Sequence, residues 1–120
     1  MEKNIIVELS TAYALRIIDF SEVLESKKKF VVAKQILRSG TSIGANVRES
    51  QNAESKADFI HKLKIAAKEA SELQYWIELC SLAKSYLDPD PILFKDLHSI
   101  INNISKIIIS SKQKPSNSEG

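Results

Sequence analysis

The stretch QILRSGTSIGANVRESQNAESKADFIHKLKIAAKEASELQYWIEL, residues 35–79, decides the fold. Its second half carries apolar residues that step by four and three, a spacing typical of a helix buried along a left-handed helix–helix interface. These residues are Phe59, Leu63, Ala66, Ala70, Leu73, Ile77 and Cys80. Ser55 followed by Asp58 is a variant capping box, which satisfies free amides in a first helical turn. We therefore predict a long helix that begins at residue 56.

The first half of this stretch predicts a preceding helix with an unusual surface. Its apolar stripe comprises Val32, Ile36, Gly40, Ile43 and Val47. Gly40 and Gly44 fall in the middle of this helix, where each glycine costs about 1 kcal/mol relative to alanine. Glycine persists at such positions where another backbone comes close, so we expect tight packing there.

Two further periodic segments flank these helices. The N-terminal stripe comprises Ile6, Leu9, Tyr13, Ile17, Phe20 and Leu24, and the C-terminal stripe comprises Leu93, Leu97, Ile100, Ile101, Ile104 and Ile108. Asp90 is a candidate N-cap for the last helix, with Pro91 at its first position. The predicted helices span 4–26, 30–53, 56–87 and 91–111, and a flexible polar tail spans 112–120. Because short connections force consecutive helices to be antiparallel, residues 1–111 predict one all-α domain, an up-down-up-down four-helix bundle.

Composition agrees with a small helical domain. The chain has 120 residues, 43% of them hydrophobic, and only three glycines and three prolines, too few for the many turns of an all-β fold. A single cysteine, Cys80, excludes an internal disulfide and fits a reducing cytoplasm. Glu8, Arg16 and Asp19 interrupt the apolar N-terminal segment, so we expect neither a signal peptide nor a membrane span.

Charge is distributed unevenly along the chain, although the net charge is only +2. Residues 27–68 hold ten basic and three acidic side chains, a balance of +7, and acidic segments flank them. A basic face of this kind is typical of proteins that bind a polyanion, although the same lysines could simply solvate two helices. The candidate nucleic-acid contacts are Lys27, Lys28, Lys29, Lys34, Arg48, Lys56, Lys62, Lys64 and Lys68.

The predicted third helix has a second apolar stripe beside its main one. This stripe includes Ile65, Trp76, Leu79, Ala83 and Tyr86. A helix buried along more than one face needs additional partners, so Ile65, Trp76, Leu79 and Tyr86 are candidates for an oligomer interface. The alternative is a wide core stripe capped by Trp76.

A polar stripe on the second helix also has two interpretations. It comprises Arg38, Ser42, Asn46 and Glu49. In the first interpretation it forms a structural ladder, in which Arg38 meets Glu69 or Glu72 and Asn46 bonds across to the third helix. In the second, Asn46, Arg48 and Glu49 form a surface ligand site.

Catalytic and metal-binding patterns are weak. A di-metal bundle needs two Glu-x-x-His motifs, whereas this chain offers one Asp58-x-x-His61, in which Asp58 is better explained as a cap. The GTSIG segment at 40–44 lacks the Lys-Ser/Thr of a phosphate-binding loop. Cys80 lies on the core stripe, and neither histidine supports a triad. We expect no catalytic residue, no metal and no cofactor, and hence no enzyme.

The central segment resembles the four-helix-bundle family named for proteins encoded in intervening sequences of bacterial 23S ribosomal RNA genes. The residues that carry the resemblance are Arg38, Ser39, Ser42, Ile43, Ala45, Asn46, Glu49, Phe59, Ile65, Ala66, Glu72 and Leu73. They cover about a third of the chain. Arg48 departs from the pattern, since many members carry Ala or Ile before the glutamate. The resemblance implies that Arg38, Ser42, Gly44, Asn46, Glu49 and Glu72 have structural roles.

The resemblance also implies a homopentamer. The family is in turn distantly similar to the accessory variability determinant protein of diversity-generating retroelements. That relative is a positively charged pentamer that binds nucleic acid and a reverse transcriptase. Two functional hypotheses follow. The first is a cytoplasmic pentamer that binds nucleic acid, RNA ahead of DNA, through repeated basic patches. The second is a protein-interaction scaffold or accessory subunit to another enzyme, such as a reverse transcriptase.

Overall fold

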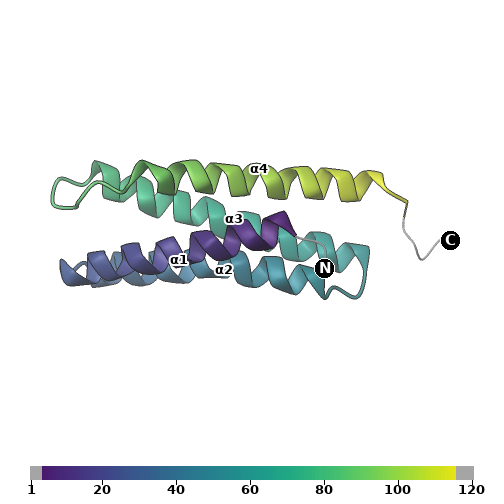
Figure 1. The fold of residues 1–120 in the computed structure, drawn as a ribbon, viewed down its shortest axis with the longest axis horizontal. Helices are drawn as coiled ribbons and strands as arrows, with labels where there is room; N and C mark the ends of the chain where they lie inside the picture. The colour runs from purple at the N-terminus through teal and green to yellow at the C-terminus, as the bar shows by residue number, and fades with distance from the viewer. Residues whose placement is uncertain (1–3, 116–120) are drawn as a thin grey trace.

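The computed structural model describes residues 4–115, which form four helices (Figure 1). These are α1 (Ile5–Ser26), α2 (Phe30–Gln51), α3 (Lys56–Leu82) and α4 (Pro91–Gln113). Successive helices run antiparallel along a rod of 57 × 23 × 23 Å. The predicted all-α, up-down-up-down bundle is confirmed.

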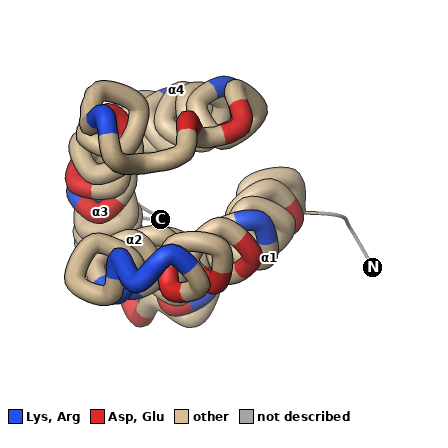
Figure 2. Tube along the Cα trace, turned by 90° about the vertical axis from the view of Figure 1, so that its left-hand side faces the viewer, with Lys and Arg blue, Asp and Glu red and all other residues tan. Residues whose placement is uncertain are grey.

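Each helix packs on two neighbours. α1 contacts α2 and α4, and α3 contacts α2 and α4, so α1 and α3 occupy diagonally opposite corners of the bundle (Figure 2). The α2–α3 pair is the most extensive and the α1–α4 pair the least. The bundle is therefore built around the hairpin that contains residues 35–79.

The connections place distant segments at the same end of the rod. The turn between α1 and α2 (residues 27–29) and the loop between α3 and α4 (residues 83–90) lie together, at the left of Figure 1, and we call this end the turn end. The α2–α3 connection (residues 52–55) lies at the opposite end, together with the start of α1 and the end of α4. Antiparallel topology thus joins sequence segments that are more than 50 residues apart.

The caps at two helix starts are as predicted. The Ser55 hydroxyl accepts a hydrogen bond from the Asp58 amide at 3.0 Å. The Asp90 carboxylate accepts from the Ile92 amide at 3.0 Å, with Pro91 at the first turn of α4. These bonds satisfy amides that have no partner within their own helices.

The predicted end of the third helix at residue 87 is wrong. α3 ends at Leu82, because Ala83 adopts an extended backbone (φ −75°, ψ 124°) and a turn follows in which the Tyr86 amide donates to the Ala83 carbonyl at 3.2 Å. This turn brings Tyr86 against the core, with the Lys29 ammonium 4.7 Å from the centroid of its ring. Residues 83–86 thus form a turn that packs Tyr86 on the core, and they do not continue the helix as periodicity predicted.

The other helix ends differ less from prediction. α2 ends at Gln51 instead of residue 53, and α4 continues to Gln113, two residues into the predicted polar tail. Lys114 and Pro115 follow the helix, and residues 116–120 of that tail lie outside the described residues.

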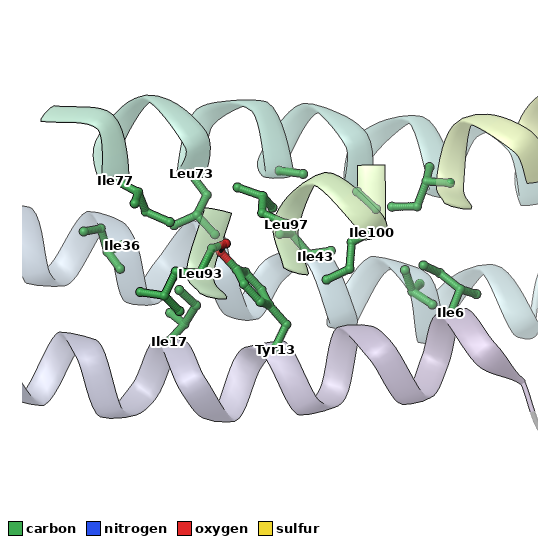
Figure 3. Close-up of a cluster of buried hydrophobic side chains, with 14 of the residues drawn as sticks. Ile6, Tyr13, Ile17, Ile36, Ile43, Leu73, Ile77, Leu93, Leu97 and Ile100 are labelled. Atoms are coloured by element: carbon green, nitrogen blue, oxygen red, sulfur yellow. Dashed lines mark hydrogen bonds between the residues drawn. The ribbon is translucent and has the colours of Figure 1, made fainter. Parts of the chain in front are cut away.

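Buried side chains from all four helices form a single core (Figure 3). The predicted stripes supply it, and Cys80 and most of the α3 stripe are buried as expected. The Tyr13 hydroxyl crosses from α1 and donates to the Leu93 carbonyl of α4 at 2.9 Å. Burial, and secondly the charge of Asp96, raises the pKa of Tyr13 above its ordinary range, so this hydroxyl remains a donor.

The two mid-helix glycines of α2 both face α1, but a different part of α1 lies against each of them. A Cβ atom on Gly40 would lie 2.5 Å from Cγ2 of Ile17, whereas one on Gly44 would lie 3.5 Å from the Ser10 carbonyl oxygen. The expected close approach of a backbone is therefore wrong at Gly40, where a side chain fills the space. At Gly44 a backbone does lie alongside, at ordinary van der Waals distance.

In residues 4–115, we find no helix whose length and apolar character would suit a crossing of the bilayer.

Candidate nucleic-acid interface

The nine basic residues predicted to contact nucleic acid do not form one patch. Lys27, Lys28, Lys29 and Lys34 gather at the turn end, and Figure 2 shows the run of lysines between α1 and α2 on this end of the bundle. None of these four lysines forms an ion pair with another described residue. Their charges are therefore free to meet an anion.

The backbone of the α1–α2 turn is well ordered by hydrogen bonds. The Lys28 amide donates to the Glu25 carbonyl at 2.8 Å, and the Lys29 amide donates to the Leu24 carbonyl at 2.9 Å. Lys28 has a φ of 62°, a left-handed conformation that costs a residue other than glycine roughly 1 kcal/mol. The turn thus presents three consecutive lysines from a defined backbone.

Three of the other candidates are already engaged with the protein. The Arg48 guanidinium donates to the Thr11 hydroxyl at 3.2 Å, and the Lys62 ammonium lies 3.6 Å from the Glu49 carboxylate. Lys56 donates to the backbone carbonyl of Lys114. These contacts tie the cations to neighbouring helices and make them weaker candidates.

Lys64 and Lys68 occupy a different surface, the exposed face of α3. They lie four residues apart on that helix, so they project from neighbouring turns of the same face. Neither forms an ion pair among the described residues. This face is a second basic surface, separate from the turn end.

Sequence reasoning missed one basic residue at the turn end. Lys84 belongs to the acidic C-terminal segment, yet the α3–α4 loop places it beside Lys27 and Lys29 around one cavity. The predicted topology contained the signal, because in an up-down-up-down bundle the first and third connections share an end.

Arg38 forms the predicted contact with α3. Its guanidinium lies 2.9 Å from Glu69 and also binds Glu72, which in turn accepts from the Trp76 indole at 3.3 Å. Burial acts to lower the pKa of Arg38, but the hydrogen bonds and charges of the two glutamates outweigh it and raise that pKa. The contact is internal to the chain and joins α2 to α3.

The rest of the predicted ladder is wrong. The Asn46 amide donates at 2.9 Å to the Ser42 carbonyl of its own helix, and the Ser42 hydroxyl donates at 2.6 Å to the Arg38 carbonyl. Short polar side chains reach the carbonyl four residues earlier more readily than they reach another helix. In the alternative ligand site, Asn46, Arg48 and Glu49 likewise each have a protein partner.

The second apolar stripe of α3 is divided between core and surface. Trp76 and Tyr86 pack against the core, as the wide-stripe interpretation expects, and Ile65 and Leu79 are half-buried. Leu79 and Tyr86 also line an open cavity of about 370 Å³. Its lining comprises Val32, Leu79, Cys80, Leu82, Ala83 and Tyr86. Leu82 is 78% exposed, so this apolar surface is left uncovered in the single chain.

Other reactive side chains do not gather into a site in the part of the chain that the structure describes. Between residues 4 and 115, no group of three or more His, Cys, Asp or Glu side chains could hold a metal ion. Burial raises the pKa of the Cys80 thiol, which disfavours the thiolate that a nucleophile needs.

Comparison with known proteins places the chain in a family. A family model described as 23S rRNA-intervening sequence protein matches residues 2–110. The chain belongs to this family. A crystal structure of a family relative, a protein of unknown function from the S23 ribosomal protein family of Bacteroides thetaiotaomicron, is 42% identical. The match covers 91% of this chain and 99% of that one, with a TM-score of 0.70. No curated protein matches the chain.

Proposed function

We propose that this member of the 23S rRNA-intervening sequence protein family is a non-enzymatic homo-oligomer, a pentamer, that binds nucleic acid in the cytoplasm, with RNA as the favoured ligand. The observation that carries the proposal is that six of the predicted contact lysines have neither an ion-pair partner nor a hydrogen-bond partner in a side chain among the described residues. They are Lys27, Lys28, Lys29, Lys34, Lys64 and Lys68. Lysines of this kind bind phosphates as point charges and release the counterions that surround nucleic acid.

Repetition around a ring would strengthen weak contacts. A single chain offers only a few phosphate contacts, but five copies on one assembly would engage a long polyanion at high effective concentration. Two aromatic side chains are exposed among residues 4–115, Phe30 next to Lys29 and Tyr75 on the same helix as Lys64 and Lys68. Because two isolated rings do not form a row on which successive bases could stack, we expect phosphates to be bound ahead of bases.

The assembly itself rests on the family resemblance and on the uncovered apolar cavity around Leu82. We assign a second copy of the chain as its cover. The exposed side of α1 carries large apolar side chains, among them Leu15, and would pack on this apolar surface. α1 and α3 are different surfaces of the chain, so a contact between α3 of one copy and α1 of the next is head-to-tail, the kind of contact that forms a ring when its rotation closes.

Fluorescence anisotropy with a structured RNA and a matched DNA duplex, titrated at several salt concentrations, tests the binding proposal. We expect binding whose logarithm falls linearly with the logarithm of salt, with a slope of about 0.7 to 0.9 per phosphate contacted. Absence of binding to both ligands at low salt would refute the proposal and leave the lysines as solvating charge.

Replacing Lys27, Lys28 and Lys29 together with glutamine should weaken RNA binding and flatten its salt dependence, because phosphate contacts are lost without any base contact. The matched control replaces Lys106, Lys112 and Lys114 with glutamine, which removes the same charge from exposed positions toward the opposite end of the rod. Equal effects of the two triple variants would mean that net charge, and not the turn, governs binding.

A protein-interaction scaffold is the second candidate, and the exposed apolar cavity is the observation that favours it. In this role the cavity would receive a partner enzyme, of which a reverse transcriptase is the example suggested by the resemblance. Affinity capture with and without nuclease separates the two roles. Nuclease-resistant capture of one defined protein, blocked by Leu82→Glu, would favour the scaffold.

A further inference from the structure

A small cavity at the turn end brings lysines from two distant segments together. Its volume is about 300 Å³, and its lining comprises Val23, Leu24, Lys27, Lys29, Lys84, Ser85, Tyr86 and Leu87. Lys27 and Lys29 come from the α1–α2 turn and Lys84 from the α3–α4 loop. Figure 2 looks onto this end of the bundle and shows basic residues on both connections.

The three ammonium groups are not neutralised by the protein. None of them forms an ion pair with another described residue. The nearby loop does contain Asp88 and Asp90, but the Asp90 carboxylate caps α4 through the Ile92 amide. Like charges that line one cavity repel each other, and a bound anion would relieve that repulsion.

One of the lysines is held in position. The Lys29 ammonium lies 4.7 Å from the centroid of the Tyr86 ring, a cation–π contact, and Tyr86 packs against the core. Lys29 is itself half-buried. Its charge is therefore placed at the cavity by a fixed aromatic ring and has less freedom than that of an ordinary surface lysine.

The local backbone adds to the positive potential. α2 begins at this cavity without a side-chain cap and without an acidic residue in its first turn. Three lysines precede this N-terminus, where the helix dipole disfavours cations by about 0.3 to 1 kcal/mol each. This arrangement of charge is unfavourable in the free protein, and a bound anion would offset it.

We propose that this cavity holds a phosphate group of the nucleic-acid backbone, contacted by Lys27, Lys29 and Lys84 with Ser85 as an additional hydroxyl donor. The inference rests on the proposed function and adds to it a defined phosphate site and one new contact residue, Lys84. Its three cationic groups are lysine ammoniums, which bind phosphate as point charges.

The test compares Lys84→Gln with Lys106→Gln, an exposed lysine of α4 that removes the same charge far from the cavity. RNA affinity is measured by anisotropy against salt, and the midpoint of thermal unfolding is measured with and without inorganic tripolyphosphate. We expect Lys84→Gln to weaken RNA binding several-fold and to lower the salt slope by about one per occupied site. Tripolyphosphate should stabilise the wild type and Lys106→Gln more than Lys84→Gln.

The outcomes separate this inference from the proposed function. RNA binding by the wild type that Lys84→Gln leaves unchanged would overturn the site alone and leave the function standing. A tripolyphosphate effect that is lost in Lys84→Gln, without any change in RNA affinity, would overturn the assignment to nucleic acid. If Lys84→Gln instead reduces the mass of the assembly, the lysines belong to a subunit contact, and the inference is wrong. No RNA binding by the wild type would overturn both.

Discussion

Gly40 and Gly44 lie one turn apart on α2, yet an added methyl group meets different surroundings at the two positions. At Gly40 it would press on the branched side chain of Ile17, which is fully buried. At Gly44 it would touch the Ser10 carbonyl at an ordinary distance. Packing against Ile17 therefore requires a glycine at position 40. At position 44 packing would allow alanine, which has the higher helix propensity.

Gly40→Ala should lower the free energy of unfolding by about 1 to 2 kcal/mol, since overpacking outweighs the gain in helix propensity. Gly44→Ala should leave that free energy unchanged or raise it by up to about 1 kcal/mol. Urea unfolding of both variants, followed by circular dichroism, provides the measurement. Stabilisation by Gly40→Ala would show that Ile17 can move aside at little cost.

At the scale of elements, the α2–α3 hairpin is joined by a polar contact as well as by the core. Arg38 binds both Glu69 and Glu72, and the side chain of Glu69 is only 16% exposed. Without the guanidinium, two carboxylates would face each other, one of them largely removed from water. The contact thus disfavours other registers of α2 against α3 more than it adds to stability, because exposed ion pairs contribute little.

Arg38→Met should destabilise the protein by about 1 kcal/mol, and adding Glu72→Gln should restore part of the loss, because one of the two facing charges is then removed. A double-mutant cycle from thermal or urea unfolding at low salt and in 1 M salt measures the coupling. We expect the coupling to shrink at high salt, since the side chains of Arg38 and Glu72 are both partly exposed to solvent. Strictly additive effects would mean that Arg38 and Glu72 act independently.

At the scale of the whole molecule, one surface of the bundle is incomplete. The cavity around Leu82 is apolar and open, and Leu82 itself is 78% exposed. Such a surface marks an interface when it is contiguous and flanked by charge. Its location next to Lys29 and Lys84 means that assembly and phosphate binding would use adjacent parts of the turn end.

Leu82→Glu should convert the proposed oligomer into a folded monomer, because the residue contributes little to the core of its own chain. Size-exclusion chromatography with light scattering gives the mass, and circular dichroism confirms the helices. Ile109→Glu is the control, since this α4 residue is similarly exposed at 57% and lies outside the cavity. An unchanged mass for Leu82→Glu would place the interface elsewhere on the bundle.

Most of the fold could be predicted from periodic residues. The α3 stripe from Leu63 to Cys80 is buried as expected, and the caps at Ser55 and Asp90 formed as expected. These features are local, because a repeat of four and three residues or a hydroxyl before a first turn acts within a few residues. The candidate site was less predictable: of the predicted basic residues, Arg48, Lys56 and Lys62 turned out to be engaged with the protein.

The amino-acid sequence by itself determined the class of fold, the four helices and the order in which they pack, because helix periodicity and short connections leave few alternatives. Only the tertiary structure decided which charges are neutralised, where α3 ends, and that Lys84 lies with Lys27 and Lys29. Those outcomes depend on contacts between residues far apart in the chain. The end of α3 and the position of Lys84 depend on Tyr86, which turns back onto the core, and no pattern within a single helix specifies that turn.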